Sequence, residues 1–282
     1  MMPEQPALEI RRACPADEAA IARLLQLTSR PSTMAWRWQQ HLEDETFLVT
    51  LWRSRLVGAI LAWPDAGPVA WVRLGTLDGG FRLGPWLDQC LPLLIPPLRR
   101  LGARMLAWMD VAAWAGPALQ QRGFRLLSRL VTMVKKDRRL PPIGAVNAVL
   151  RPATAADLPA LLRLDHAAFS PPWWLGGATL ERARREALCF LVAEREGRLL
   201  GYSEAQFTPN GAHIGRLAVS PLAQGQGVGQ TLLASTLRCL WQQRVTHVTL
   251  NTQESNLTSQ RLYAAFGFVA VPRRVVAWQR AI

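Results

Sequence analysis

The stretch PLAQGQGVGQTLL, residues 221–233, places glycine at positions 225, 227 and 229, directly before an apolar pattern of helical period that runs to Leu240. Glycine lets backbone N–H groups converge on an anion at close range, and the first turn of a helix adds unsatisfied donors and partial positive charge. A strand ending at Val219, this glycine turn and the helix after it therefore predict a phosphate-binding loop.

The spacing separates this loop from two common phosphate-binding motifs. The dinucleotide pattern G-x-G-x-x-G requires glycine at position 230, which is Gln230, and the Walker pattern Gly-Lys-Ser/Thr is absent. The stretch instead fits Q/R-x-x-G-x-G/A through Gln224, Gly227 and Gly229. On this motif alone, a strand-to-helix turn that binds no ligand stays open as the alternative.

A second motif follows at residues 256–268, NLTSQRLYAAFGF, and fits N-x-x-A/S-x-x-x-Y-x-x-x-G-F. With both motifs in this order, residues 148–282 resemble the GNAT superfamily of acyl-CoA N-acyltransferases. The resemblance implies acetyl-CoA as co-substrate and transfer of its acetyl group to a primary amine, by direct attack in a ternary complex.

The resemblance also implies which residues bind the coenzyme. The loop would hold the coenzyme A pyrophosphate, the bulged strand before it would offer main-chain groups, and the second motif would line the pantetheine and ADP-side channel. The residues at these places are Leu217, Ala218, Val219, Gln224, Gly225, Gln226, Gly227, Val228, Gly229, Gln230, Asn256 and Ser259. Asn256 and Ser259 are equally suited to the start of a helix.

An amine that attacks a thioester needs a donor at the departing sulfur and an acceptor for its own proton. By the resemblance, Tyr263 is the acid at the sulfur; the alternative is packing on a helix face. The strand at residues 213–219 carries no carboxylate. His213 and Glu204 are therefore the candidate bases, and loss of the proton to solvent is a third possibility.

In this family, acceptor choice comes mainly from the first two helices and their connection. That connection is FSPPWWLGG here, residues 169–177, an aromatic loop stiffened by proline. Trp173 and Trp174 are the candidates to stack on an acceptor, or else they cover the core.

The sequence contains an internal repeat. IRRACPAD at residues 10–17 is answered by LRPATAAD at 150–157, RLVG at 55–58 by RLLG at 198–201, and GF at 123–124 by GF at 267–268, so the offset lies between 140 and 144 residues. Strands separated by helices predict an α/β layered fold, with a mixed twisted sheet flanked by helices. The repeat predicts two such domains in tandem, residues 1–136 and 148–282, joined by a linker at 137–147.

The first copy lacks the motif residues. At offset 143, Gln224, Gly227 and Gly229 correspond to Phe81, Gly84 and Trp86; at offset 144, Asn256, Ser259 and Tyr263 correspond to Ala112, Ala115 and Leu119. We therefore expect residues 8–136 to be a degenerate copy that does no acetyl transfer. Its helix also contains Pro92, Pro96 and Pro97, which we expect to kink or shorten it.

Composition limits the compartment and the partners. The four cysteines stand far apart without a C-x-x-C pair, which favours reduced thiols in a cytoplasmic protein and disfavours a metal site. Neither a signal peptide nor a membrane span is expected. The net charge of +13 comes almost entirely from scattered arginine, which favours a solvated surface that attracts an anionic ligand over nucleic-acid binding. A homodimer is compatible with the sequence.

Two functions follow. The first is an N-acetyltransferase whose acceptor is a primary amine of a small molecule or a peptide N-terminus. The second is a non-catalytic acyl-CoA-binding sensor or scaffold, which the missing carboxylate on the strand before the loop favours.

Overall fold

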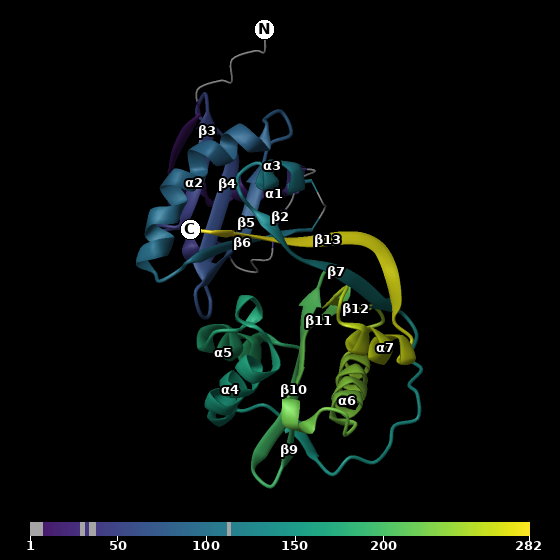
Figure 1. The fold of residues 1–282 in the computed structure, drawn as a ribbon. Helices are drawn as coiled ribbons and strands as arrows, with labels where there is room; N and C mark the ends of the chain where they lie inside the picture. Colours follow the sequence, from purple (N-terminus) through teal and green to yellow (C-terminus); the bar gives the residue numbers. More distant parts are fainter. Residues whose placement is uncertain (1–7, 29–31, 34–37, 112–113) are drawn as a thin grey trace. The chain divides into compact units, whose positions relative to one another are not determined.

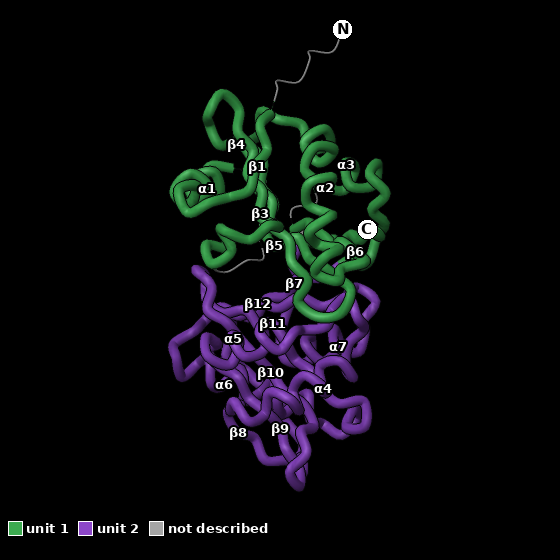
Figure 2. The backbone as a smooth tube through the Cα atoms, turned by 90° about the vertical axis from the view of Figure 1, so that its left-hand side faces the viewer, with its two compact units in different colours: residues 1–129, 274–282 green, residues 130–273 purple. Residues whose placement is uncertain are grey.

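The structure is a computed structural model that describes residues 8–28, 32–33, 38–111 and 114–282 (Figure 1). The chain forms two compact units (Figure 2). Unit 1 comprises residues 1–129 and 274–282, and unit 2 comprises residues 130–273. Each has a mixed sheet with helices against it, as the α/β prediction requires.

Unit 2 contains a sheet of strand order β7-β12-β11-β10-β9-β8. Its only parallel pair joins β11 to β12 across the crossover helix α6, and the other pairs are antiparallel. The strands are β7 (Arg125–Lys135), β8 (Val149–Pro152), β9 (Cys189–Arg195), β10 (Arg198–Thr208), β11 (Gly211–Val219) and β12 (Val248–Gln253).

Four helices cover the two faces of this sheet (Figure 1). Leu161 of α4 and Leu180 of α5 pack with Val192 and Tyr202 in one apolar cluster. Leu237 of α6 and Tyr263 of α7 pack with Ile214 in another. The helices are α4 (Leu158–Ala168), α5 (Gly177–Glu186), α6 (Val228–Gln242) and α7 (Leu257–Ala265).

Unit 1 repeats this arrangement with strand order β1-β3-β4-β5-β6-β13. The strands are β1 (Glu9–Arg12), β3 (Phe47–Trp52), β4 (Arg55–Pro64), β5 (Val69–Leu77), β6 (Met105–Asp110) and β13 (Val269–Ala281), and the short β2 (Ser32–Thr33) pairs with β5. The helices are α1 (Glu18–Leu27), α2 (Leu83–Arg100) and α3 (Gly116–Gln120).

The repeat is visible in matching ion pairs. Arg11 forms two hydrogen bonds with the Asp17 carboxylate, and Arg151 forms two with the Asp157 carboxylate. Each aspartate directly precedes its helix, but its carboxylate accepts the backbone N–H three residues earlier, from Cys14 or Thr154, instead of a helix N–H. The two halves therefore share local chemistry as well as strand order.

The unit boundaries differ from the predicted domain boundaries. Residues 130–135 of β7 pair with β12 in unit 2, whereas residues 276–281 of β13 pair with β6 in unit 1. The closing strand of each sheet thus comes from the other half of the sequence. The predicted boundaries at 136 and 148 assumed that each repeat keeps its own last strand, and a strand pattern does not specify which sheet it joins.

The prolines of α2 do not shorten it, contrary to the expectation. The helix runs unbroken through Pro92, Pro96 and Pro97 and is 18 residues long. Pro92 and Pro96 lie four residues apart on its exposed face, while Cys90, Leu94 and Leu98 on the opposite face are fully buried. The burial of that apolar face outweighs the missing backbone hydrogen bonds.

Candidate active site

The glycine loop precedes α6 as predicted and exposes backbone donors. Gly225 and Gly227 adopt φ of 76° and 80°, the left-handed region that favours glycine. Among the described residues, no protein acceptor meets the amide of any residue from 224 to 230; the first α6-turn bond is donated by Thr231 to Gly227. The loop therefore offers a row of free N–H groups at a helix N-terminus, which is the arrangement that binds phosphate.

The loop lies where three elements meet. A Cβ placed on Gly229 would lie 3.5 Å from Val219 Cγ2 at the end of β11 and 3.7 Å from Leu262 Cδ2 on α7. A methyl group fits there, which agrees with the G/A position of the motif. Both predicted motifs are thus brought together at the first turn of α6.

The parallel ladder between β11 and β12 is short. It pairs residues 212–214 with 248–250, while β11 continues to Val219 beside β10 alone. On the side facing away from β10, Leu217, Ala218 and Val219 therefore have main-chain groups without a strand partner in the described structure. Ala218 is buried, and Leu217 and Val219 are half-buried, so their contribution to a site is the backbone.

A β-bulge precedes this unpaired segment, as the resemblance implies. The register between β10 and β11 shifts between Glu204 and Ala205, which leaves Gly215 as the extra residue. A Cβ on Gly215 would lie 2.6 Å from Glu204 Oε2. The Glu204 carboxylate therefore lies over the bulge, and only glycine leaves room for it.

Glu204 has the properties of a general base. Its side chain is 5% exposed, and its Oε1 atom has no hydrogen-bond partner among the described residues. Burial raises the pKa of this carboxyl to about 7, against the opposing effects of Gln206 and the Arg216 charge. A carboxylate of this pKa accepts protons efficiently near neutral pH.

His213, the other candidate base, lies where β11 and β12 are still paired. Its Nδ1 atom is 2.8 Å from Thr249 Oγ1, across the parallel ladder. The ring is half-buried and engaged with the neighbouring strand, three residues before the Glu204 partner Arg216. This geometry favours Glu204 as the base.

Tyr263 lies on α7 in the apolar cluster that also contains Leu217 of β11. The side chain is 7% exposed, and its ring packs against Phe268 with the centroids 5.9 Å apart. Burial raises the pKa of the phenol to about 12, while a hydrogen bond with Ser259 acts in the opposite direction. The phenol therefore stays protonated at neutral pH and is available as a donor.

Asn256 caps the helix. Its Oδ1 atom accepts the backbone N–H of Ser259 at 3.1 Å, which is the usual N-cap interaction. Two roles were considered for Asn256, lining the coenzyme channel and capping a helix, and the structure contains the helix cap. Ser259, one turn before Tyr263, is half-buried, and its influence on the Tyr263 pKa opposes that of burial.

The comparisons with known proteins agree with this geometry. Residues 158–268 match the acetyltransferase (GNAT) family. This segment of the chain is a GNAT acetyltransferase domain. It contains the glycine loop, Glu204 and Tyr263.

Two named acetyltransferases are similar in sequence to larger or smaller parts of the chain. The chain is 30% identical over 200 residues to the mycothiol acetyltransferase of Acidothermus cellulolyticus, an alignment that covers 61% of each protein. It is 42% identical over 91 residues to the phosphinothricin N-acetyltransferase of Alcaligenes faecalis, covering 29% of this chain and 45% of that protein. The chain thus spans less than two thirds of the length of either relative.

A solved structure has the same fold over nearly the whole chain. The tandem GNAT protein from the clavulanic acid biosynthesis pathway superimposes with a TM-score of 0.69 at 18% identity, covering 98% of both chains. At this identity the likeness concerns the fold. Both units of the chain therefore have GNAT architecture.

The acceptor loop of the GNAT domain is held by residues that the sequence analysis missed. Trp174 donates from Nε1 to the Phe169 carbonyl at 2.8 Å, and its indole stacks on His166. The Trp173 carbonyl accepts a hydrogen bond from Arg216. Arg216 itself pairs with Asp165, which is fully buried. Two features of the sequence could have indicated this ion pair: an arginine within the strand, Arg216, and an aspartate on the apolar face of the helix, Asp165.

Unit 1 has different side chains at the corresponding places. Trp86 occupies the first turn of α2, where Gly229 occupies that of α6; it is fully buried and donates to Thr50 Oγ1 at 2.7 Å. Leu119, the counterpart of Tyr263, is also fully buried, and Ala112, the counterpart of Asn256, lies outside the described residues. Unit 1 therefore keeps one motif glycine, Gly84, but lacks the counterparts of Gly229 and of the Tyr263 phenol.

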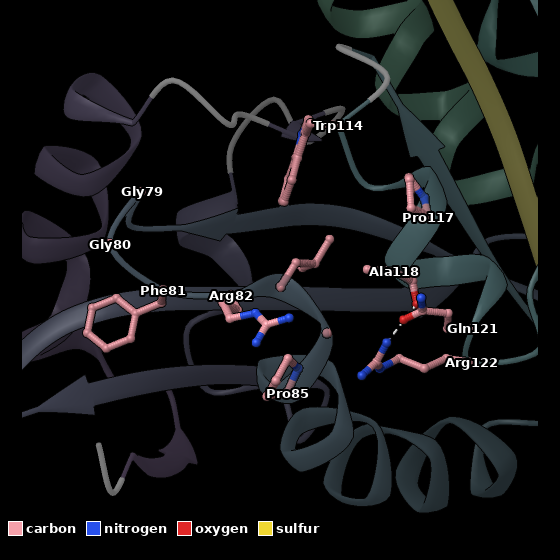
Figure 3. A pocket seen from close by; sticks show the side chains of 12 residues that line it. Gly79, Gly80, Phe81, Arg82, Pro85, Trp114, Pro117, Ala118, Gln121 and Arg122 are labelled. Atoms are coloured by element: carbon pink, nitrogen blue, oxygen red, sulfur yellow. Dashed lines mark hydrogen bonds between the residues drawn. The ribbon is translucent and has the colours of Figure 1, made fainter. Parts of the chain in front are cut away.

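A cavity of about 600 Å³ lies beside the start of α2 in unit 1 (Figure 3). Its lining includes Phe81 and Arg82 from the segment before α2 and Arg122 from the turn after α3. Arg122 is already paired with Asp88 at 2.5 Å and donates to the Ala118 carbonyl. By the repeat offset, this cavity lies at the position in unit 1 that corresponds to the glycine loop of unit 2.

Among the described residues, no helix combines the length and the apolar composition that crossing a membrane requires. No group of three or more histidine, cysteine, aspartate or glutamate side chains in that part of the chain is placed to hold a metal ion.

Proposed function

We propose that the protein is an acetyl-CoA-dependent N-acetyltransferase, with catalysis in unit 2. The observation that carries the proposal is the row of unpartnered amides at residues 224–230, beside the unpaired end of β11. These amides and the α6 N-terminus would hold the pyrophosphate, with added positive charge from Arg195, whose guanidinium lies 3.4 Å from Gln226 Oε1. The residues present therefore suit a coenzyme A thioester.

The thioester supplies an activated acetyl group, and the chain supplies proton transfer and alignment. As the nitrogen of the amine bonds to the acetyl carbon, Glu204 takes a proton from the nitrogen. The carbon–sulfur bond breaks, and the Tyr263 hydroxyl donates to the departing sulfur. A reference thiol has a pKa near 8.5, so a phenol that burial keeps protonated can serve as donor without further tuning.

The missing carboxylate on the strand before the loop was the main argument for a non-catalytic sensor, and the position of Glu204 answers it. The strand before the loop has no carboxylate in its sequence, but the bulge at Gly215 places the Glu204 carboxylate of β10 over that strand. We propose this carboxylate as the proton acceptor, in place of one on the strand itself. The acceptor that we propose is a primary amine, on a small molecule or a peptide N-terminus, beside Trp173 and Trp174.

The four cysteines support a reducing compartment, for which we propose the cytoplasm. All four are free thiols, and Cys90 and Cys189 are buried. Burial raises the pKa of the Cys90 thiol to about 12, which keeps it unreactive.

The test measures coenzyme binding and thiol release separately. The purified protein should bind acetyl-CoA in a calorimeter and release free coenzyme A when a panel of small amines and short peptides is added. If acetyl-CoA binds but no amine causes release of coenzyme A, the protein is a non-catalytic sensor. A failure to bind would remove the coenzyme site itself.

A further inference from the structure

Asp165 is a fully buried carboxylate that joins three elements of unit 2. Its Oδ2 atom accepts the Tyr202 hydroxyl of β10 at 2.5 Å, and its Oδ1 atom accepts the Leu175 amide at 2.9 Å. Arg216 of β11 adds two hydrogen bonds of 2.8 Å, from Nε to Oδ2 and from Nη2 to Oδ1. Burial raises the pKa of the Tyr202 phenol, which keeps it protonated as a donor.

Arg216 carries this interaction to the acceptor loop. Its Nη2 atom donates to the Trp173 carbonyl at 2.5 Å, and its guanidinium lies 3.6 Å from the centre of the Phe169 ring. Two further contacts hold the loop. Trp174 Nε1 donates to the Phe169 carbonyl within it, and His166 Nε2 of α4 lies 3.1 Å from the Leu175 carbonyl. Residues 169–175 are thus fastened at both ends and in the middle.

The same arginine is next to the candidate base. Arg216 follows the bulge residue Gly215 and is the ladder partner of Glu204. One residue therefore fixes the loop on one side and borders the reacting region on the other. Rigid support of this kind determines how well a bound amine is aligned.

We propose that Arg216 is a positioning residue for the acceptor. Through Asp165 it holds the aromatic turn 169–175 in place beside Glu204. The binding surface for the amine is therefore preorganised before the amine binds. This inference rests on the proposed function, and it adds a specificity-determining element to it.

The first half of the chain provides a natural comparison. Unit 1 keeps the bulge between β4 and β5, with Leu61 and Leu74 as the last pair before the shift, where Glu204 and Arg216 stand in unit 2. By the repeat offset, Leu25 and Ala59 stand where Asp165 and Tyr202 stand. Because an apolar set suffices to build the fold there, stability alone does not require the buried ion pair in unit 2.

The variant Arg216→Lys tests the proposal, since it keeps the charge beside Glu204 and removes the two-pronged contact with Asp165. We expect kcat/KM for the acceptor amine to fall by about 100-fold, with the KM for acetyl-CoA unchanged. Backbone amides 173–175 should exchange with deuterium faster than in the wild type. The matched control is Arg185→Lys, whose exposed arginine on α5 pairs with Glu181; it should change neither quantity.

Tyr202→Phe is a milder second variant, because it removes one donor to Asp165 and leaves the ion pair. It should raise the KM for the acceptor less than Arg216→Lys does. Wild-type exchange at residues 173–175 in Arg216→Lys, or an equal rise of both KM values, would overturn the inference alone. Absence of turnover in the wild type would overturn the proposed function and this inference with it.

Discussion

The two units share a β-bulge at the same place, and they differ in what surrounds it. In unit 2 the extra residue is Gly215, with Glu204 opposite; in unit 1 it is Arg73, with Leu61 opposite. Leu61 is fully buried and apolar, whereas Glu204 is a buried carboxylate with an unpartnered oxygen. The bulge therefore belongs to the fold, and the chemistry is added by the side chains around it.

The same contrast holds at the helix that follows. Gly229 keeps the first turn of α6 free of a side chain, with room for a methyl group between β11 and α7. In unit 1 the Trp86 indole fills the corresponding turn: it is buried in the core, and its Nε1 atom would lie 3.0 Å from a Cβ placed on Gly58. A large side chain in this turn favours a packed core over a ligand site. Under the proposed function, unit 2 is the catalytic copy and unit 1 is a copy whose corresponding turn is filled by core packing.

The largest expected effect is on Glu204. The isosteric change Glu204→Gln should lower kcat/KM by about 10²–10⁴-fold, because it removes the proton acceptor, and acetyl-CoA binding should persist. Initial rates of thiol release and a calorimetric titration measure the two. Leu61→Met, at the matching place in unit 1, should leave the rate unchanged. A Glu204→Gln enzyme with the wild-type rate would remove the functional difference between the two bulges.

Glu204 also makes stability depend on pH. Its carboxyl has a folded-state pKa of about 7, above the ordinary 4.5, so the folded state binds the proton more tightly. The folded state therefore loses stability as pH rises from about 4.5 to 7, by about 3 kcal/mol in total. Glu204→Gln should accordingly raise the melting temperature at pH 8 relative to the wild type, and not at pH 5.

The matching substitution in unit 1, Leu61→Gln, removes no titratable group. Leu61→Gln buries an amide without a partner, so it should lower stability equally at pH 5 and pH 8. Thermal unfolding at the two pH values distinguishes the variants. A pH-independent effect of Glu204→Gln would mean that the carboxyl titrates in its ordinary range.

Tyr263→Phe should have the next largest effect. Loss of one hydrogen bond to a developing thiolate corresponds to roughly 2 kcal/mol, or about 30-fold in kcat. The affinity for acetyl-CoA should stay the same, because the ring and its packing against Phe268 are kept. Single-turnover kinetics give the rate, and Leu119→Met in unit 1 is the control. An unchanged rate would assign Tyr263 to packing alone.

The smallest expected effect concerns the loop. Gly227→Ala adds a Cβ at a φ of 80° and at 2.9 Å from Val146 Cγ2, which should cost about 1–2 kcal/mol and raise the dissociation constant of acetyl-CoA by about 10-fold. Gly84→Ala in unit 1 has an ordinary φ and meets only the flexible end of Arg122, so binding should not change. Equal affinities in both variants would contradict the assignment of the loop as a coenzyme site.

Local sequence patterns were sufficient to predict the loop, the second motif and the fold class. Gly225 and Gly227 are needed for their backbone conformation, and that requirement is visible in the sequence. The network around Asp165 was not predictable, since Tyr202 and Arg216 lie 37 and 51 residues away from it along the chain. Such contacts depend on which faces of α4, β10 and β11 meet, which follows from tertiary packing.

The compact units differ from the predicted domains for a related reason. The final strand of each repeat has the same alternating pattern, and nothing in it specifies the sheet that it joins. The short first strands, β1 and β8, were not predicted, because four residues carry little periodicity. In α2 a local signal was present but misleading. Burial of one helix face outweighed the local effect of three prolines, so the helix is unbroken.

The exchange of closing strands gives the chain an order of assembly. Residues 130–135 leave the ribosome before the remainder of unit 2, so that sheet can close as soon as β12 has been made. Unit 1 must wait with an open β6 edge until residues 276–281 are synthesised, after all of unit 2. Unit 1 is thus the last to be completed, and until then its unpaired β6 edge can pair with another chain, which exposes the nascent protein to aggregation.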